Sequence, residues 1–164
     1  MYHTVVIGGG CLGAATAVSL QKKLNKLGKG EKVGLIEKAV LCAAESSRHS
    51  GIVRSANADP DASMMASIST QMWKNIREHW GIDMELDEFG AIWIAKKNSD
   101  GDNPAWTDLS KRMEKINLVF EEIDPDSAIQ KCGTTLITDK DESYFYEPGA
   151  FQLDPSILRS ALYE

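Results

Sequence analysis

The chain has 164 residues, enough for one domain with a buried core, and its 43% hydrophobic and 26% charged residues exclude a disordered polymer. The formal net charge of −6 argues against a nucleic-acid partner, because phosphate binding requires clustered Lys and Arg. No apolar run approaches the roughly 20 residues that span a bilayer, and no signal-peptide pattern is present, so we expect no transmembrane segment. Cys11, Cys42 and Cys132 show no metal-ligand spacing and no even count, which favours a cytoplasmic protein without a metal site and leaves peripheral membrane association open.

The first elements that the sequence predicts are a strand, a helix and a second strand. Residues 2–7 form a β-rich run that stops at three glycines, which is typical of a buried strand followed by a tight turn. Residues 12–27 carry apolar side chains at helical spacing, and residues 33–37 form a second apolar run. Strand, helix and strand within so short a segment predict a βαβ crossover with a parallel sheet.

The rest of the chain predicts a long loop followed by alternating helices and strands. Residues 38–59 are rich in Ala and Ser and lack strong periodicity, which favours a functional loop with short helical pieces. A helix is expected from Pro60 to about Trp80, with Gly81 as its C-cap. We further expect strands at 89–95 and 118–123, helices at 104–117, from 125 and from 155, and loops at 98–103 and 147–149.

A glycine motif lies between the first predicted strand and helix. The run Gly8-Gly9-Gly10-Cys11-Leu12-Gly13 satisfies the pattern G-x-G-x-x-G. Gly8 permits a sharp turn, Gly10 lets a pyrophosphate approach the backbone, and Gly13 lets the helix pack closely on the strand. The N–H groups and the dipole at the helix start, where Cys11 and Leu12 lie, then face the pyrophosphate.

A carboxylate at the end of the second predicted strand extends this motif. Glu37 can accept hydrogen bonds from the ribose hydroxyls of an adenosine, and its negative charge disfavours the 2′-phosphate of NADP. The alternatives are a glycine turn that binds nothing and a solvated charge at a strand end. The combination favours a dinucleotide-binding unit, without distinguishing NAD from FAD.

The loop after Glu37 carries a family resemblance. Glu37-Lys38, a stretch of small residues and the run from Ser46 to Arg54 resemble the FAD-dependent D-amino-acid oxidase superfamily, and most of all its sarcosine oxidase and glycine oxidase branch. Residues 90–94 and 146–155 are similar to a strand of that family and to the stretch that returns to its cofactor domain. The resemblance implies FAD as the cofactor, and it adds to the expected cofactor contacts Lys38, Ser46, Ser47, Arg48, His49, Ser50 and Gly51.

Two residues of this loop are candidates for a role near the substrate. In the similar enzymes an Arg in a comparable loop clamps a substrate carboxylate, which implies this role for Arg54; the alternative is a surface ion pair. His49 is a candidate flavin contact or covalent tether, and the alternative is a loop histidine with only a hydrogen-bonding role.

The predicted fold class is α/β, with a Rossmann-like FAD-binding βαβ unit and part of a mixed α+β substrate domain. We assign residues 1–60 to the FAD-binding segment, 61–146 to a partial substrate domain and 147–164 to the return toward the FAD-binding domain. Members of the resembled family are longer, so the chain is expected to be incomplete at its C-terminal side. The remaining polypeptide or a partner subunit would complete the fold, and this chain alone should have little activity.

The expected function is oxidation of a small-molecule amine or amino acid by hydride transfer to the flavin. One alternative is an FAD-dependent 2-hydroxy-acid or glycerol-phosphate dehydrogenase of the same superfamily, since Arg54 suits either carboxylate. Another is a non-catalytic flavin-binding subunit or fragment. The Ser-rich loop argues against a NAD-binding domain.

Overall fold

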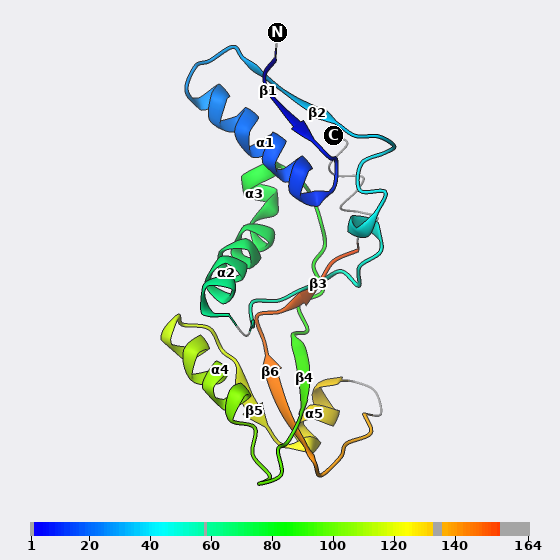
Figure 1. The fold of residues 1–164 in the computed structure, drawn as a ribbon, viewed down its shortest axis with the longest axis vertical. Coiled ribbons are helices and arrows are strands. Elements are labelled where there is room, and N and C mark those ends of the chain that lie inside the picture. The colour runs from blue at the N-terminus through cyan, green and yellow to red at the C-terminus, as the bar shows by residue number, and fades with distance from the viewer. Residues whose placement is uncertain (1, 58, 133–135, 155–164) are drawn as a thin grey trace. The chain divides into compact units, whose positions relative to one another are not determined.

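The computed structural model describes residues 2–57, 59–132 and 136–154. The chain divides into two compact units, residues 2–51 and Ile52–Leu153, and each is described by itself (Figure 1). In the described part of the chain, no helix is long and apolar enough to cross a membrane.

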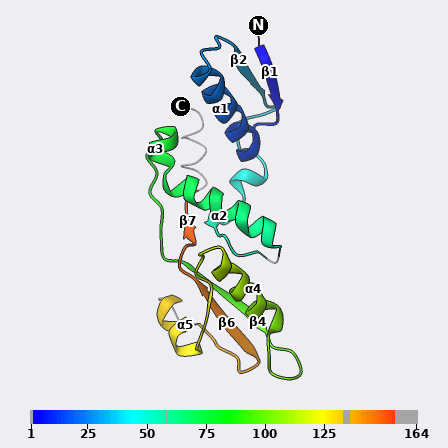
Figure 2. The same cartoon turned by 90° about the vertical axis from the view of Figure 1, so that its left-hand side faces the viewer.

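The first unit is the predicted βαβ arrangement. Its elements are β1 (Tyr2–Ile7), α1 (Cys11–Lys26) and β2 (Lys32–Ile36), and β1 pairs with β2 in parallel. The helix buries Ala14, Ala17 and Leu24, and it packs on both strands (Figures 1 and 2). Small side chains on this face let the helix lie close to the sheet. The parallel βαβ prediction is therefore confirmed.

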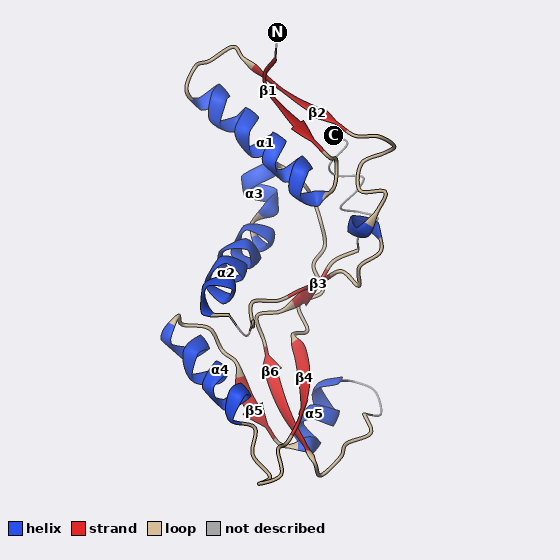
Figure 3. Cartoon of the chain, viewed as in Figure 1, coloured by secondary structure: helices blue, strands red, loops and turns tan. Residues whose placement is uncertain are grey.

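The long loop after β2 is also present. Figure 3 shows it as mostly irregular chain, interrupted by the short 3-10 helix η1 (Glu45–Ser47), which agrees with the expected helical pieces. The sequence did not predict the strand β3 (Ile52–Val53) that follows. A two-residue strand is too short for a periodic pattern, and it is stabilised by its antiparallel partner far along the chain.

The second unit combines helices with two antiparallel sheets. Its further elements are α2 (Pro60–Lys74), α3 (Ile76–Trp80), β4 (Ala91–Lys96), α4 (Pro104–Lys115), β5 (Glu121–Ile123), α5 (Pro125–Cys132), β6 (Glu142–Glu147) and β7 (Phe151–Gln152). One sheet has the strand order β4-β6-β5, and the other pairs β3 with β7. Mixed helices and antiparallel strands of this kind are typical of an α+β arrangement.

Three expectations for the second unit need correction. The helix predicted from Pro60 to Trp80 is two helices, because Asn75 ends α2 and begins α3 with a φ of −104°. Gly81 caps α3 in the left-handed conformation, as expected. Strands β6 and β7 were not predicted, and Glu147, placed in a loop by the sequence, ends β6. The helix expected from residue 155 lies outside the described residues.

The position of β6 at the centre of its sheet shows why the sequence did not predict this strand. It is paired on both edges and buried on both faces, so its side chains show no simple alternation of apolar and polar residues. Trp93 and Phe145 lie opposite each other and face α4, where Trp106 packs within 5.6 Å of both rings. On the other face, the Lys131 ammonium of α5 lies 3.9 Å from the centre of the Tyr146 ring. Figures 1 and 2 show α4 and α5 on different sides of this sheet.

Candidate functional site

The glycine motif forms the turn from β1 into α1. Gly8 has a φ of +104°, a conformation that residues with a Cβ rarely adopt, and its N–H donates to the Ile36 carbonyl at 2.8 Å. A Cβ on Gly13 would lie 1.8 Å from the Gly8 carbonyl oxygen. These two glycines therefore allow the sharp turn and the close contact of helix and strand, which are the physical roles that the sequence assigned to them.

The N-terminus of α1 presents hydrogen-bond donors without a capping carboxylate. Gly10 is the N-cap and supplies no side-chain cap, and the first turn of this fully described helix carries no acidic residue. The Cys11 N–H and the Cys11 thiol both donate to Ser46 Oγ, at 3.0 and 3.1 Å. A Cβ on Gly10 would lie 3.1 Å from the same hydroxyl. A helix N-terminus with a hydroxyl beside it is suited to a phosphate, because both are donors to its oxygens.

Glu37 lies directly beside the glycine turn. Its two carboxylate oxygens accept the N–H of Gly9 at 2.7 Å and the N–H of Ala39 at 3.0 Å. The Gly9 hydrogen bond, followed by that from Ala39, holds the pKa of Glu37 below its ordinary value. An ionised carboxylate has about four lone-pair sites, so two remain for the hydroxyls of a ribose.

Gly9 is a further requirement of this turn that the sequence did not reveal. A Cβ at this position would lie 2.6 Å from Leu41 Cδ2 and 2.9 Å from the Glu37 Cβ. The Gly9 carbonyl also accepts the Cys42 N–H at 2.8 Å. The segment after β2 thus packs against the glycine turn, and three consecutive glycines were the only signal for this contact.

The remaining predicted cofactor residues are arranged around this centre. His49 Nδ1 accepts the Gly51 N–H at 2.9 Å, so the neutral imidazole carries its proton on Nε2. The Ser47 hydroxyl donates to the Ala44 carbonyl at 3.0 Å. The exposed members of the predicted set are Gly8, Leu12, Lys38, Ser47, Arg48, His49 and Ser50, whereas Gly51 is buried. The structure therefore gathers the glycines, Cys11, Glu37 and Ser46, and leaves most of the later loop on the surface of this unit.

Arg54 belongs to the second unit. Its guanidinium lies 4.5 Å from the centre of the Trp93 ring, and Nη1 donates to the Ala56 carbonyl at 2.6 Å. Within residues 2–57, 59–132 and 136–154 no carboxylate forms an ion pair with it, unlike the surface pair considered from the sequence. It borders a cavity of about 370 Å³ whose other lining side chains include Trp106, Leu109 and Arg112. A guanidinium stacked on an indole keeps in-plane N–H donors for a carboxylate.

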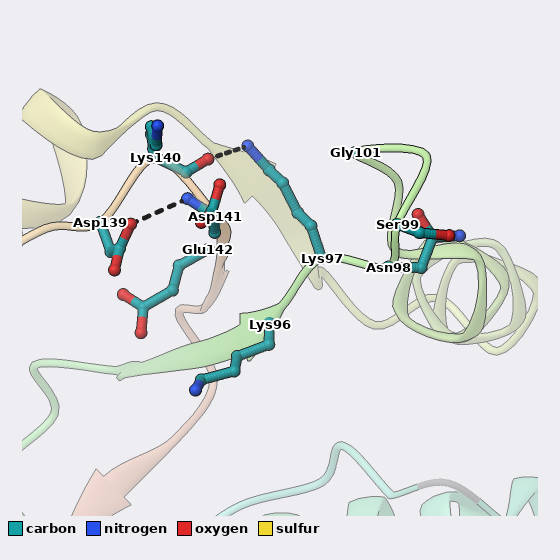
Figure 4. A pocket seen from close by; sticks show the side chains of 9 residues that line it. All are labelled: Lys96, Lys97, Asn98, Ser99, Gly101, Asp139, Lys140, Asp141 and Glu142. Atoms are coloured by element: carbon teal, nitrogen blue, oxygen red, sulfur yellow. Dashed lines mark hydrogen bonds between the residues drawn. The ribbon is translucent and has the colours of Figure 1, made fainter.

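A second hollow lies at the opposite end of the β4–β6 pair. It measures about 610 Å³, and its lining residues, drawn in Figure 4, are Lys96, Lys97, Asn98, Ser99, Gly101, Asp139, Lys140, Asp141 and Glu142. Lys97 Nζ donates to the Lys140 carbonyl, and the Asp141 N–H donates to Asp139. The lining side chains carry charges of both signs, and polar groups of the lining form hydrogen bonds with one another. The hollow therefore favours no particular class of ligand.

Comparisons with known proteins identify the family. A sequence model of the family described as DAO, FAD dependent oxidoreductase, matches residues 3–164. No curated protein sequence matches the chain.

Solved structures share the fold. The chain is similar to L-proline dehydrogenase from P. horikoshii, with 20% identity and a TM-score of 0.78 over 98% of this chain and 40% of that one. It is similar to glycine oxidase from Geobacillus kaustophilus, with 21% identity and a TM-score of 0.73 over 98% of this chain and 43% of that one. L-amino acid deaminase from Proteus vulgaris gives 19% identity and a TM-score of 0.78 over 99% of this chain and 36% of that one. The chain thus spans about two fifths of the length of these proteins. Given the family match over residues 3–164, the chain belongs to the DAO family of FAD-dependent oxidoreductases.

Proposed function

We propose that this chain supplies the FAD-binding βαβ unit and a substrate-binding arginine to an enzyme that oxidises an amine or amino acid. The observation that carries the substrate class is Arg54, whose guanidinium lies on the Trp93 ring beside a cavity and pairs with no carboxylate of the described residues. An arginine that is held against an aromatic ring and has no acidic partner is suited to bind a carboxylate. The names of the three similar structures, a proline dehydrogenase, a glycine oxidase and an amino acid deaminase, support an amino-acid substrate.

The residues of the glycine turn fit the ADP half of FAD. The N–H groups at the start of α1 and the Ser46 hydroxyl would hold the pyrophosphate, because both donate to phosphate oxygens. Glu37 would accept the ribose hydroxyls, and its lowered pKa keeps it ionised for this purpose at neutral pH. When bound, FAD supplies the hydride acceptor for oxidation of the C–H bond next to nitrogen.

The role of Arg54 in this proposal is to bind and orient the substrate. A bidentate pair between its guanidinium and the substrate carboxylate fixes the position of the neighbouring carbon, and such orientation lowers the barrier without chemical participation. Arg54 is exposed, and the Trp93 ring, whose centre lies 4.5 Å from the guanidinium carbon, limits the directions in which the guanidinium can turn. No proton transfer is assigned to this residue.

Oxidation of a 2-hydroxy acid is the second candidate, because the same arginine would bind its carboxylate. Two substrate panels distinguish the candidates in one experiment. The purified protein that contains this chain, with flavin bound, is mixed without oxygen with glycine, sarcosine and L-proline, and separately with lactate and glycerol 3-phosphate. Bleaching of the flavin absorbance by an amine supports the proposal. Bleaching by lactate or glycerol 3-phosphate without bleaching by any amine refutes the amine assignment, and a protein without flavin absorbance refutes the function as a whole.

A further inference from the structure

Glu147 is a buried carboxylate to which neither the cofactor site nor the proposed chemistry assigns a role. It ends β6, and only 2% of its surface is exposed. Glutamate is rarely buried so fully unless its charge is compensated, because removing a carboxylate from water is costly. Its surroundings therefore have to supply hydrogen-bond donors.

Three N–H groups meet this carboxylate. Oε1 accepts the backbone N–H groups of Ser55 and Ala56, the second at 3.1 Å. Oε2 accepts the indole Nε1–H of Trp93 at 3.1 Å. Both oxygens of the side chain therefore have donors, and the three N–H groups are held together at one point.

The same three donors surround Arg54. Ser55 and Ala56 directly follow it, and the Ala56 carbonyl accepts its Nη1–H at 2.6 Å. The Trp93 ring lies under its guanidinium, with 4.5 Å between the guanidinium carbon and the ring centre. Glu147 thus binds the backbone that follows Arg54 and the ring that lies under its guanidinium. It contacts the guanidinium itself in no described hydrogen bond or ion pair.

We propose that Glu147 is a positioning residue that fixes the orientation of Arg54 for the substrate carboxylate. The inference rests on the proposed function, because it takes Arg54 as the carboxylate ligand. Glu147 acts only through Arg54: it locks the segment 54–56 to the end of β6 and prevents rotation of the Trp93 indole. A bidentate pair needs both N–H groups of the guanidinium in a fixed plane, so loss of either support weakens it.

The isosteric substitution Glu147→Gln replaces one of the two carboxylate oxygens by an NH2 group, so it tests their hydrogen bonds separately. The remaining amide oxygen can still accept the N–H groups of Ser55 and Ala56, but the amide nitrogen would face the Trp93 N–H, and two donors cannot bond each other. The indole should therefore turn away and leave the guanidinium without its lower support. In a Trp93→Phe background this conflict does not exist, so Glu147→Gln should have a much smaller effect there.

The test is a double-mutant cycle in the flavin-loaded protein, with benzoate as the carboxylate probe and the flavin absorbance change as readout. Glu147→Gln should raise the Kd for benzoate about tenfold, as should Arg54→Ala, and the combination should be no worse than Arg54→Ala alone. The second readout is turnover of an amino acid that the enzyme oxidises. Glu147→Gln should raise KM for this substrate by a similar factor and change kcat by less than about twofold. Equal effects of Glu147→Gln with and without Arg54 overturn the positioning role and leave the proposed function intact. No effect of Arg54→Ala removes the carboxylate role of Arg54 itself.

A structural control excludes general destabilisation. Ala128 is fully buried on α5, and it forms no described side-chain hydrogen bond or ring contact with Ser55, Ala56, Trp93 or Glu147. Ala128→Gly should lower the urea midpoint while leaving the benzoate Kd unchanged. An equal rise in Kd for Ala128→Gly overturns the proposal. If Glu147→Gln fails to fold, Trp93→Phe alone, which removes one donor and keeps a ring, should raise the Kd about threefold, and an unchanged Kd contradicts the proposal.

Discussion

At the scale of single residues, Glu37, which we propose as the ribose ligand, links the stability of the fold to pH. Its pKa is lowered by the N–H groups of Gly9 and Ala39, so the folded protein favours the ionised form. A depressed pKa contributes stability above the unfolded value, about 4.5, and this contribution is lost as pH falls through the folded pKa.

The prediction concerns the free energy of unfolding at acidic pH. Between about pH 6 and pH 3, the free energy of unfolding should fall more steeply for the wild type than for Glu37→Gln, whose amide does not titrate. Urea denaturation at several pH values measures this difference. Lys29, an exposed residue between α1 and β2 that is not among the causes of the lowered Glu37 pKa, provides a control: Lys29→Gln should keep the wild-type slope. Parallel curves for the wild type and Glu37→Gln would refute the coupling.

Arg54 yields a second residue-scale prediction. Arg54→Lys keeps the charge but loses the planar fork that binds a carboxylate bidentately, so the affinity for a carboxylate ligand should fall about tenfold. The affinity for the same amine without its carboxylate should stay within about twofold, as measured by flavin absorbance titration.

Arg77→Lys is the matched control for this change. Arg77 and its partner Asp83 are 78% and 80% exposed, and a surface pair of this kind contributes little. Its substitution should leave carboxylate affinity unchanged. Equal losses for Arg54→Lys and Arg77→Lys would indicate a long-range charge effect instead of direct binding.

Single residues also show which features of the site can be predicted from the sequence. The turn at Gly8 and the close contact at Gly13 were predictable, because both follow from the local geometry between a strand and the next helix. The burial of Glu147 was not, since a glutamate before Pro148 and Gly149 is typical of an exposed loop. Its partners Ser55 and Trp93 lie 92 and 54 positions away.

At the scale of elements, the contact between α1 and β1 depends on the absence of a side chain at Gly13. A Cβ there would lie 1.8 Å from the Gly8 carbonyl, so Gly13→Ala must push the helix away from the strand. Overpacking of this kind costs about 1–3 kcal/mol, and it also moves the N–H groups that would face the pyrophosphate. We expect a lower free energy of unfolding and a higher Kd for FAD, measured by urea denaturation and by FAD fluorescence quenching.

Gly30→Ala is the control for this prediction. Gly30 has open space around its Cβ position and no positive φ, so an alanine fits there without strain. Both its stability and its FAD affinity should match the wild type within about 0.5 kcal/mol. An FAD affinity that is unchanged in Gly13→Ala would contradict the role assigned to the α1 N-terminus.

Helices were predicted more completely than strands for a physical reason. The start of α2 is encoded locally: Asp59 accepts the N–H groups of Asp61 and Ala62, and Pro60 occupies the first turn. The strand β6 depends on two partners that are distant in sequence, β4 and β5. Pairing of this kind leaves no mark in a local window, because burial on both faces removes the alternation.

At the scale of the whole molecule, the two units differ in how much core they contain. The second unit has an apolar cluster of Ala56, Leu109, Met113, Phe120 and Phe145, all at most 7% exposed. In the first unit, β1 and β2 pair with no other described strand, and Ile7 and Ile36 are 85% and 57% exposed. Because these apolar side chains stay exposed, the first unit buries little apolar surface, and we expect it to be marginally stable by itself.

This contrast predicts the behaviour of the separated units. Residues 52–153 expressed alone should unfold cooperatively in urea, with a free energy on the order of 5 kcal/mol and a change in Trp fluorescence. Residues 1–51 alone should show no cooperative transition by circular dichroism. A cooperative transition in the short piece would show that β1, α1 and β2 suffice for folding.

The amino-acid sequence alone determined the βαβ unit, its glycine turn and the carboxylate beside it, because turn conformation, helix start and strand end depend on neighbouring residues. It also carried the resemblance that the family match over residues 3–164 confirmed. Only the tertiary structure showed that the Trp93 ring lies under Arg54 and that Glu147 binds both this ring and the backbone after Arg54. Those contacts arise when β3 pairs with β7 and β4 with β6, which brings together residues 54 to 92 positions apart that no local pattern relates.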